Sequence, residues 1–100
     1  MKNPFNNLDK TLEHRLRLQI MSVLIANEYA DFNSLKEMLG VTDGNLASQM
    51  KALEKEKYIS VNKSFNDRKP ITKYKATEKG KNNFRKHLDA LEEILKQQRK

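Results

Sequence analysis

Residues 35–48 read LKEMLGVTDGNLAS, and this stretch decides the fold. Leu35 and Leu39 recur at helical spacing and Gly40 follows them, which predicts a short helix closed by a glycine in the left-handed conformation. Thr42 comes two positions later, where its hydroxyl is suited to cap the start of another helix. The stretch therefore predicts two helices joined by a tight turn.

The second of these helices is predicted over residues 43–56. Its apolar residues are spaced four and then three positions apart, so they form one face that anchors the helix to a core: Leu46, Met50 and Leu53. At about 100° per residue, the opposite face is small, polar and cationic. It carries Gly44, Ser48, Lys51 and Lys55, with Asn45 on its flank. We interpret this face as a candidate binding surface, and the alternative is a solvated face without a ligand.

Upstream, a helix is predicted over about residues 12–27, because two apolar stripes run along it. One stripe consists of Leu12, Leu16, Ile20 and Leu24, and the other of Leu18, Met21 and Ile25. In a helix with two apolar faces, the first face packs on the core of its own domain, and the second face is available to pack on a different surface. That other surface is a candidate contact with a second copy of the chain.

Two strand-like runs, residues 57–62 and 71–76, predict a hairpin around a polar loop at 63–70. Asn66 and Asp67 are expected to turn the chain and Pro70 to end the loop. Its cations are Lys63, Arg68 and Lys69, which either bind an anionic partner or protect the edges of an exposed hairpin. The aromatic side chains Tyr58, Phe65 and Tyr74 are predicted to pack within the hairpin rather than to stack on bases.

A last helix is predicted to begin at Glu78 with Thr77 as its cap. Its apolar residues form a heptad-like seam with spacings of four, three and four: Phe84, Leu88, Leu91 and Leu95. We therefore predict that residues 84–97 form a dimerisation helix, with Leu8 and Leu12 completing the interface. The alternative is that this seam folds back on its own domain.

The composition narrows the class of protein. One hundred residues make a single domain, residues 1–100, and a net charge of +7 favours polyanionic partners, nucleic acid first. The chain has no cysteine, and its two histidines, His14 and His87, lie far apart without acidic neighbours at ligand spacing. We thus expect no metal, no cofactor and no enzymatic activity. No apolar run is long enough to span a bilayer and no signal peptide is recognisable, so we expect a cytoplasmic protein.

The order of the predicted elements is helix, helix, tight turn, helix and basic hairpin. This is the order of a winged helix-turn-helix, a mainly α fold in which a three-helix core carries a hairpin wing. The arrangement holds the outer face of the third helix where it can enter a DNA major groove, which is roughly 12 Å wide.

The same residues resemble a known family. LKEMLGVTDGNLAS at 35–48, LEKEKYI at 53–59, KSF at 63–65 with RKP at 68–70, and TEKG at 77–80 are similar to small winged-helix regulators related to the MarR and ArsR groups. The likeness covers roughly residues 9–95. It implies sequence-specific binding of double-stranded DNA by a homodimer that regulates transcription, and it supplies no small-molecule effector.

Within that resemblance, Thr42 and Asn45 are expected at the entrance of the groove, where Gly44 allows the backbone to approach. Ser48, Gln49 and Lys51 are expected to meet base edges or phosphates. Arg68 and Lys69 are expected to reach the adjacent minor groove or the DNA backbone. Two alternatives remain for such a fold, a docking module for another protein and an RNA-binding module.

Overall fold

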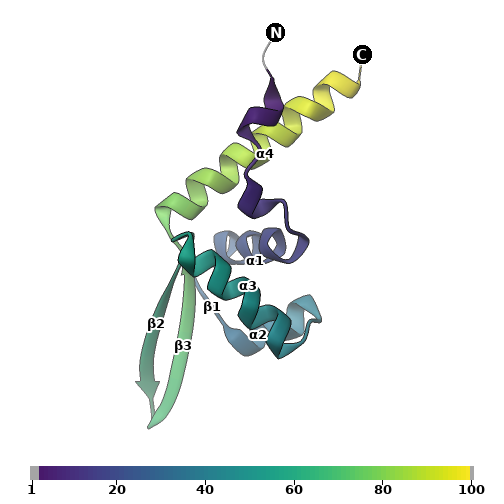
Figure 1. Ribbon diagram of the computed structural model, residues 1–100. Coiled ribbons are helices and arrows are strands. Elements are labelled where there is room, and N and C mark those ends of the chain that lie inside the picture. Colours follow the sequence, from purple (N-terminus) through teal and green to yellow (C-terminus); the bar gives the residue numbers. More distant parts are fainter. Residues whose placement is uncertain (1–2, 100) are drawn as a thin grey trace.

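The computed structural model describes residues 3–99. Its helices are α1 (Arg15–Ala26), α2 (Phe32–Leu39), α3 (Asp43–Lys55) and α4 (Glu78–Gln98), preceded by two short 3-10 helices, η1 (Pro4–Asn7) and η2 (Lys10–Leu12). The strands are β1 (Ala30–Asp31), β2 (Ile59–Asn66) and β3 (Lys69–Ala76). The first three α-helices form the body, from which α4 and the β2–β3 hairpin project in different directions (Figure 1). The predicted fold class, mainly α with a small sheet and a wing, is confirmed.

The turn between α2 and α3 is built as the sequence predicts. Gly40 adopts a left-handed conformation with φ of 62°, and its N–H donates to the carbonyl oxygen of Lys36 at 2.9 Å. Thr42 Oγ1 accepts a hydrogen bond from the N–H of Asn45 at 3.2 Å, which caps the start of α3. Lys36 and Asp43 form an ion pair of 2.8 Å across the turn. These contacts fix the angle at which α3 leaves α2.

The first helix begins later than predicted. His14 Nδ1 accepts a hydrogen bond from the N–H of Leu16 at 3.2 Å, so His14 acts as the cap and α1 starts at Arg15. Leu12 belongs to the separate turn η2, which Asp9 caps by accepting from the N–H of Thr11. The apolar spacing of residues 12–27 did not reveal this break because Leu12 still points into the same core.

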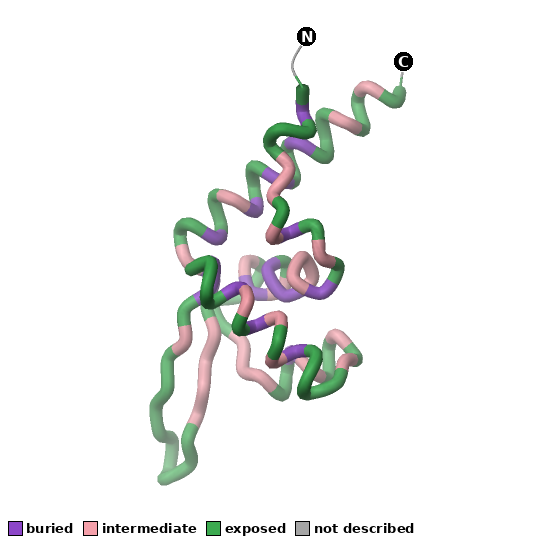
Figure 2. Tube along the Cα trace, in the orientation of Figure 1, coloured by how far each residue is buried: buried purple, intermediate pink, exposed green. Residues whose placement is uncertain are grey.

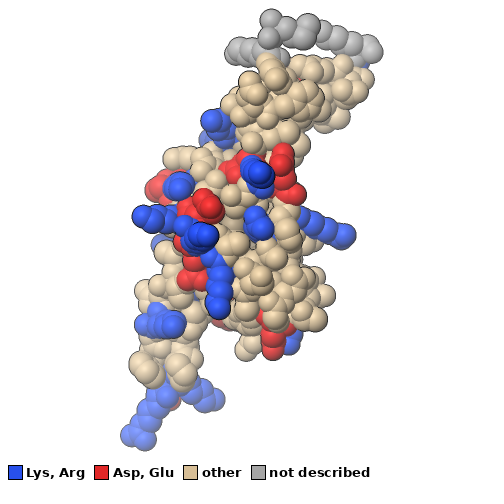
Figure 3. Space-filling view, viewed as in Figure 1, with Lys and Arg blue, Asp and Glu red and all other residues tan. Residues whose placement is uncertain are grey.

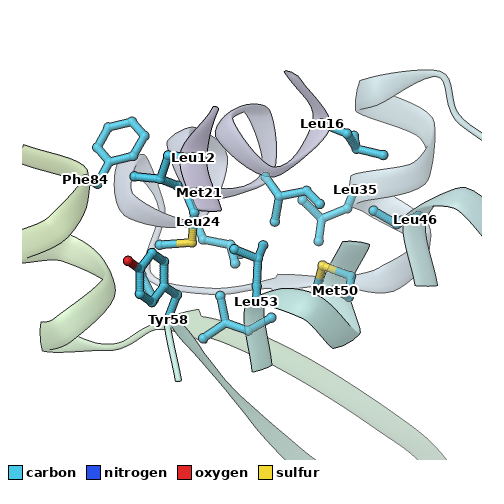
Figure 4. Close-up of a cluster of buried hydrophobic side chains, with 13 residues drawn as sticks. Leu12, Leu16, Met21, Leu24, Leu35, Leu46, Met50, Leu53, Tyr58 and Phe84 are labelled. Carbon is cyan, nitrogen blue, oxygen red and sulfur yellow. The ribbon is translucent and has the colours of Figure 1, made fainter. Parts of the chain in front are cut away.

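The hydrophobic core lies between α1, α2, α3 and the base of the hairpin (Figure 4). The three predicted anchors of α3 are confirmed, since Leu46, Met50 and Leu53 are at most 2% exposed. The second stripe of α1 is not free as a whole: Met21 is fully buried, while Leu18 and Ile25 are partly buried against the core. Most apolar side chains of α1 thus pack against the core of their own chain.

The sheet is antiparallel with the order β1-β3-β2. The two-residue strand β1, which pairs with Lys73 and Tyr74 of β3, was not predicted. The predicted loop at 63–70 is also wrong, because β2 and β3 stay paired up to Asn66 and Lys69. Only Asp67 and Arg68 turn the chain, with φ of 50° and 68°, the positive values that a two-residue hairpin turn requires.

Pro70 is part of β3 and lies opposite Phe65. A proline is tolerated there because β1 reaches only as far as Lys73, so the outer edge of β3 at Pro70 has no neighbouring strand among residues 3–99. The packing prediction is confirmed for Tyr58, which is buried, and Tyr74, which is half-buried. It is wrong for Phe65, which is 78% exposed, because the hairpin has left the body at that point.

Candidate nucleic-acid interface

The outward face of α3 is exposed along its length (Figure 2). The core holds α3 by its opposite face, which leaves open most residues predicted to contact DNA: Thr42, Gly44, Asn45, Ser48, Lys51 and Lys55. At Gly44, even an added Cβ atom would meet nothing within 4 Å. A ligand backbone therefore finds close access to the first turn of α3, at the end of the helix whose dipole favours a phosphate.

Gln49 differs from this group. Its side chain is half-buried, and its Oε1 accepts a hydrogen bond from Nε of Arg17 at 2.8 Å. Arg17 Nη1 also donates to the carbonyl oxygen of Thr11 at 3.4 Å. The contact joins α3 to α1, so in this chain Gln49 supports the position of α3 instead of projecting from its outward face. Arg17 was missed because its partner lies 32 positions away in the sequence.

The wing adds positive charge beside α3. Lys63, Arg68 and Lys69 are all exposed, and Lys and Arg side chains gather at the tip of the hairpin (Figure 3). Strand alternation puts Lys69, Lys73 and Lys75 on one face of β3, away from the face that Tyr74 and Ala76 turn toward the core. The sequence analysis considered only the cations at the tip of the wing and missed Lys73 and Lys75, although lysines at every second position of a strand lie on one face.

The base of the wing is tied to α4 by Thr77. Its N–H donates to the carbonyl oxygen of Tyr58 at 3.0 Å, and its hydroxyl donates to the carbonyl oxygen of Lys57 at 2.7 Å. The same hydroxyl accepts from the N–H of Gly80 at 3.0 Å, which caps α4. Thr77 therefore fixes three elements together, and the direction of the wing depends on where α4 begins.

A polar network extends this junction to the amino-terminal segment. Tyr58 donates its hydroxyl hydrogen to Asp9 Oδ2 and accepts from Asn83 Nδ2 at 3.0 Å. The N–H of Asp9 donates to Nδ1 of His87 at 2.8 Å. His87 is only 3% exposed and is held in this buried network, whereas His14 is the cap of α1. The network holds η1 and η2 against α4.

Burial raises the pKa of Tyr58 from its ordinary value of 10.0 to about 12, and the hydrogen bond to Asp9 adds to this rise. The folded state thus favours the neutral phenol, so its contribution to stability is complete below pH 10 and is lost as the pH rises toward 12. We expect the free energy of unfolding to fall by about 2 kcal/mol across this range. Urea unfolding at pH 9 to 12 measures it, with Tyr58→Phe as the control. Equal slopes for the two proteins would contradict the assignment.

The residues predicted to form a dimer interface separate into two groups. Leu88, Leu91 and Leu95 are 43%, 40% and 49% exposed along α4, and Leu8 is half-buried. Leu12, at 1%, lies in the core of its own chain, which corrects its assignment to the interface. Phe84 also packs mainly in that core, since it is 9% exposed.

An apolar groove of about 420 Å³ adjoins the exposed leucines of α4. It lies where α1, the end of α2 and α4 come together, and its lining is Leu18, Gln19, Ser22, Val23, Leu39, Phe84 and Leu88. Of the second stripe of α1, only Leu18 lines this groove, together with Phe84 from α4. The groove and the leucine face of α4 are thus continuous at Leu88.

Residues 3–99 contain neither a helix that could span a membrane nor a cluster that could hold a metal ion. None of the helices combines the length and the apolar character that crossing a bilayer needs. No three histidine, aspartate or glutamate side chains within the described part of the chain gather closely enough to hold a metal ion.

Together, a capped helix-turn-helix, an open polar face on α3 and a cationic hairpin define a winged-helix protein of the class that binds nucleic acid. Residues 16–95 match the family described as Winged helix DNA-binding domain, and the chain belongs to this family. The resemblance found in the sequence is therefore confirmed at the level of the family. The family and the fold are those of DNA-binding transcriptional regulators rather than of enzymes.

Relatives are found among archaeal and bacterial proteins. The uncharacterized protein MJ0432 of Methanocaldococcus jannaschii is 35% identical over 81 residues, which cover 81% of this chain and 88% of that protein. A transcriptional regulator homologue from Pyrococcus horikoshii OT3 has a TM-score of 0.80 at 29% identity, covering 86% of this chain and 85% of that one. ZitR of Lactococcus lactis, solved in complex with DNA, shares the fold with a TM-score of 0.60 at 22% identity, over 92% of this chain and 58% of its own.

Proposed function

We propose that this protein is a homodimeric transcription regulator that binds double-stranded DNA sequence-specifically. In this proposal, α3 enters the major groove while the wing lies on the adjacent minor groove or backbone. The observation that carries it is the outward face of α3, which is exposed, small and polar, and stands beside the cationic wing. In the proposed complex, Asn45 and Ser48 read base edges. The phosphates are neutralised by Lys51, Lys55, Lys63, Arg68 and Lys69.

The homodimer is proposed from α4. A single winged helix reads too short a site for useful selectivity, whereas two copies related by a dyad read half-sites about one helical turn apart. Leu88, Leu91 and Leu95 form an exposed apolar face that nothing in the described chain covers, and the groove beside it offers more apolar surface. A DNA ligand also fits the cytoplasmic location expected from the sequence.

Replacing Lys51 by alanine tests the contact surface of α3. We expect the variant to bind every duplex more weakly and to show a slope of log K against log salt that is smaller by roughly one, because one phosphate contact is lost. Fluorescence anisotropy with a mixed-sequence duplex at several salt concentrations measures both quantities. Lys86→Ala, an exposed lysine on α4, is the matched control and is expected to leave the slope unchanged.

The same titration separates the proposed function from its alternatives. Wild-type affinity that does not respond to salt would favour a docking module for another protein. Stronger binding to structured RNA in direct competition with the duplex would favour an RNA-binding module. Selection of bound fragments from a genomic library then tests whether binding is sequence-specific.

A further inference from the structure

The tip of the wing carries an aromatic side chain with no structural partner in the body. Phe65 is 78% exposed, more than any other large apolar side chain among residues 3–99. Its cross-strand partner is Pro70, and strand alternation puts both side chains on the same face of the hairpin. Toward the body, the next residues on that face are Lys63 and Thr72. Phe65 and Pro70 thus form a short apolar ridge.

A single exposed apolar residue is not unusual on a protein surface, so exposure alone does not make a site. The surroundings of Phe65 distinguish it from Met38, which is 65% exposed on α2. Lys63, Arg68 and Lys69 lie within four positions of Phe65, against one acidic residue, Asp67. Cations of this density around an aromatic ring complement a polyanion with an apolar interior, which is the chemistry of duplex DNA.

The backbone of the tip is suited to present the ring. Asp67 and Arg68 form the whole turn, so the strands remain paired up to its edge and no flexible loop intervenes. Pro70 adds a residue of fixed φ directly opposite Phe65. The minor groove is about 6 Å wide, so a side chain presented at the end of such a tip can enter it while the strands themselves stay outside.

We infer that Phe65, backed by Pro70, is a wedge that inserts from the minor groove between base pairs and deforms the DNA. This inference rests on the proposed function, and it gives the wing a role beyond charge neutralisation. Lys63, Arg68 and Lys69 hold the flanking phosphates, while the ring is buried between partly unstacked bases. Flexible pyrimidine–purine steps deform most easily, so the wedge favours sites that place such a step under the wing.

The test uses the full chain and a duplex that contains TA steps, with donor and acceptor dyes at its two ends. Wild-type protein is expected to change the energy transfer between the dyes, because the DNA bends on binding. Phe65→Ala is expected to abolish that change and to weaken binding roughly tenfold, while the salt slope stays unchanged since no charge is removed. Phe65→Leu, which keeps an apolar wedge, is expected to retain both bending and affinity.

Met38→Ala is the matched control and is expected to behave as wild type in both measurements. Because Phe65 is exposed, its removal leaves the fold intact, which circular dichroism verifies. Wild-type binding and bending that survive unchanged in Phe65→Ala would overturn the wedge and leave the proposed function standing. A wild-type protein that fails to bind the duplex at all would instead overturn the proposed function, and the wedge with it.

Discussion

Gly80→Ala is expected to destabilise the protein by roughly 3 kcal/mol, or a fall in Tm of more than about 10 °C. A Cβ atom at this position would lie 2.2 Å from the carbonyl oxygen of Tyr58 and 2.9 Å from Cε of Met21. The end of the methionine side chain has freedom to move, but the carbonyl group has little. It accepts the hydrogen bond from Thr77 that ties the wing to α4. Relief of the clash therefore requires α4 to shift from the wing.

Gly44→Ala is the control for this prediction, because nothing lies within 4 Å of the added atom. Alanine in place of a glycine inside a helix is expected to stabilise the fold by up to about 1 kcal/mol. Thermal unfolding of both variants at one protein concentration gives the comparison. A Gly80→Ala protein that unfolds at the wild-type temperature would show that α4 does not pack on Tyr58 as described.

Features set by neighbours in the sequence were the ones that sequence reasoning predicted well. The left-handed cap at Gly40, the hydroxyl cap at Thr42 and the core face of α3 each depend on a few adjacent residues. Their physical causes, a missing Cβ, a nearby hydroxyl and a helical period, are all visible in one chain. The helix-turn-helix was therefore predictable almost to the residue.

Features that depend on distant residues were not predictable in this way. Helical spacing shows that Leu12 and Phe84 are apolar positions but not whether their own core or a second copy covers them, and the structure places both in the core. The hydrogen bond from Asp9 to His87 joins residues 78 positions apart. The two-residue strand β1 exists only through its pairing with β3 and leaves no pattern of its own.

The position of the hairpin turn was predicted wrongly for a different reason. Asn66 and Asp67 have the stronger intrinsic preference for a turn, and an arginine with positive φ is uncommon. The observed turn is shifted by one residue, to Asp67 and Arg68, because the register pairs Ile59 with Ala76 and Val61 with Tyr74. With Asn66 and Asp67 as a two-residue turn, Val61 would instead lie opposite Thr72 and Ala76 opposite Lys57, which would separate the apolar partners at the base of the hairpin. The packing of apolar side chains at the base of the hairpin therefore decides where the chain turns, against the local turn preference of the residues at its tip.

Leu91→Glu is expected to convert a dimer into a monomer and to weaken binding to a selected palindromic site by roughly 100-fold. The loss is large because the two half-sites would then be bound independently, without the high effective concentration that a linked pair provides. Leu91 lies in the middle of the exposed leucine face of α4 and is 40% exposed in the single chain. A charge there is tolerated by the monomer but not by an apolar interface that excludes water.

Sedimentation equilibrium measures the molecular mass of both proteins, and Met38→Glu on α2 is the control for adding the same charge at another exposed apolar residue. The control is expected to keep the wild-type mass. If wild type and Leu91→Glu have the same mass at concentrations that saturate DNA, α4 is not the dimer interface. Unlike Gly80→Ala, Leu91→Glu changes no contact of the buried core, so its unfolding temperature as a monomer reports the stability of a single winged helix. The two variants thus separate what α4 contributes to the fold from what it contributes to assembly.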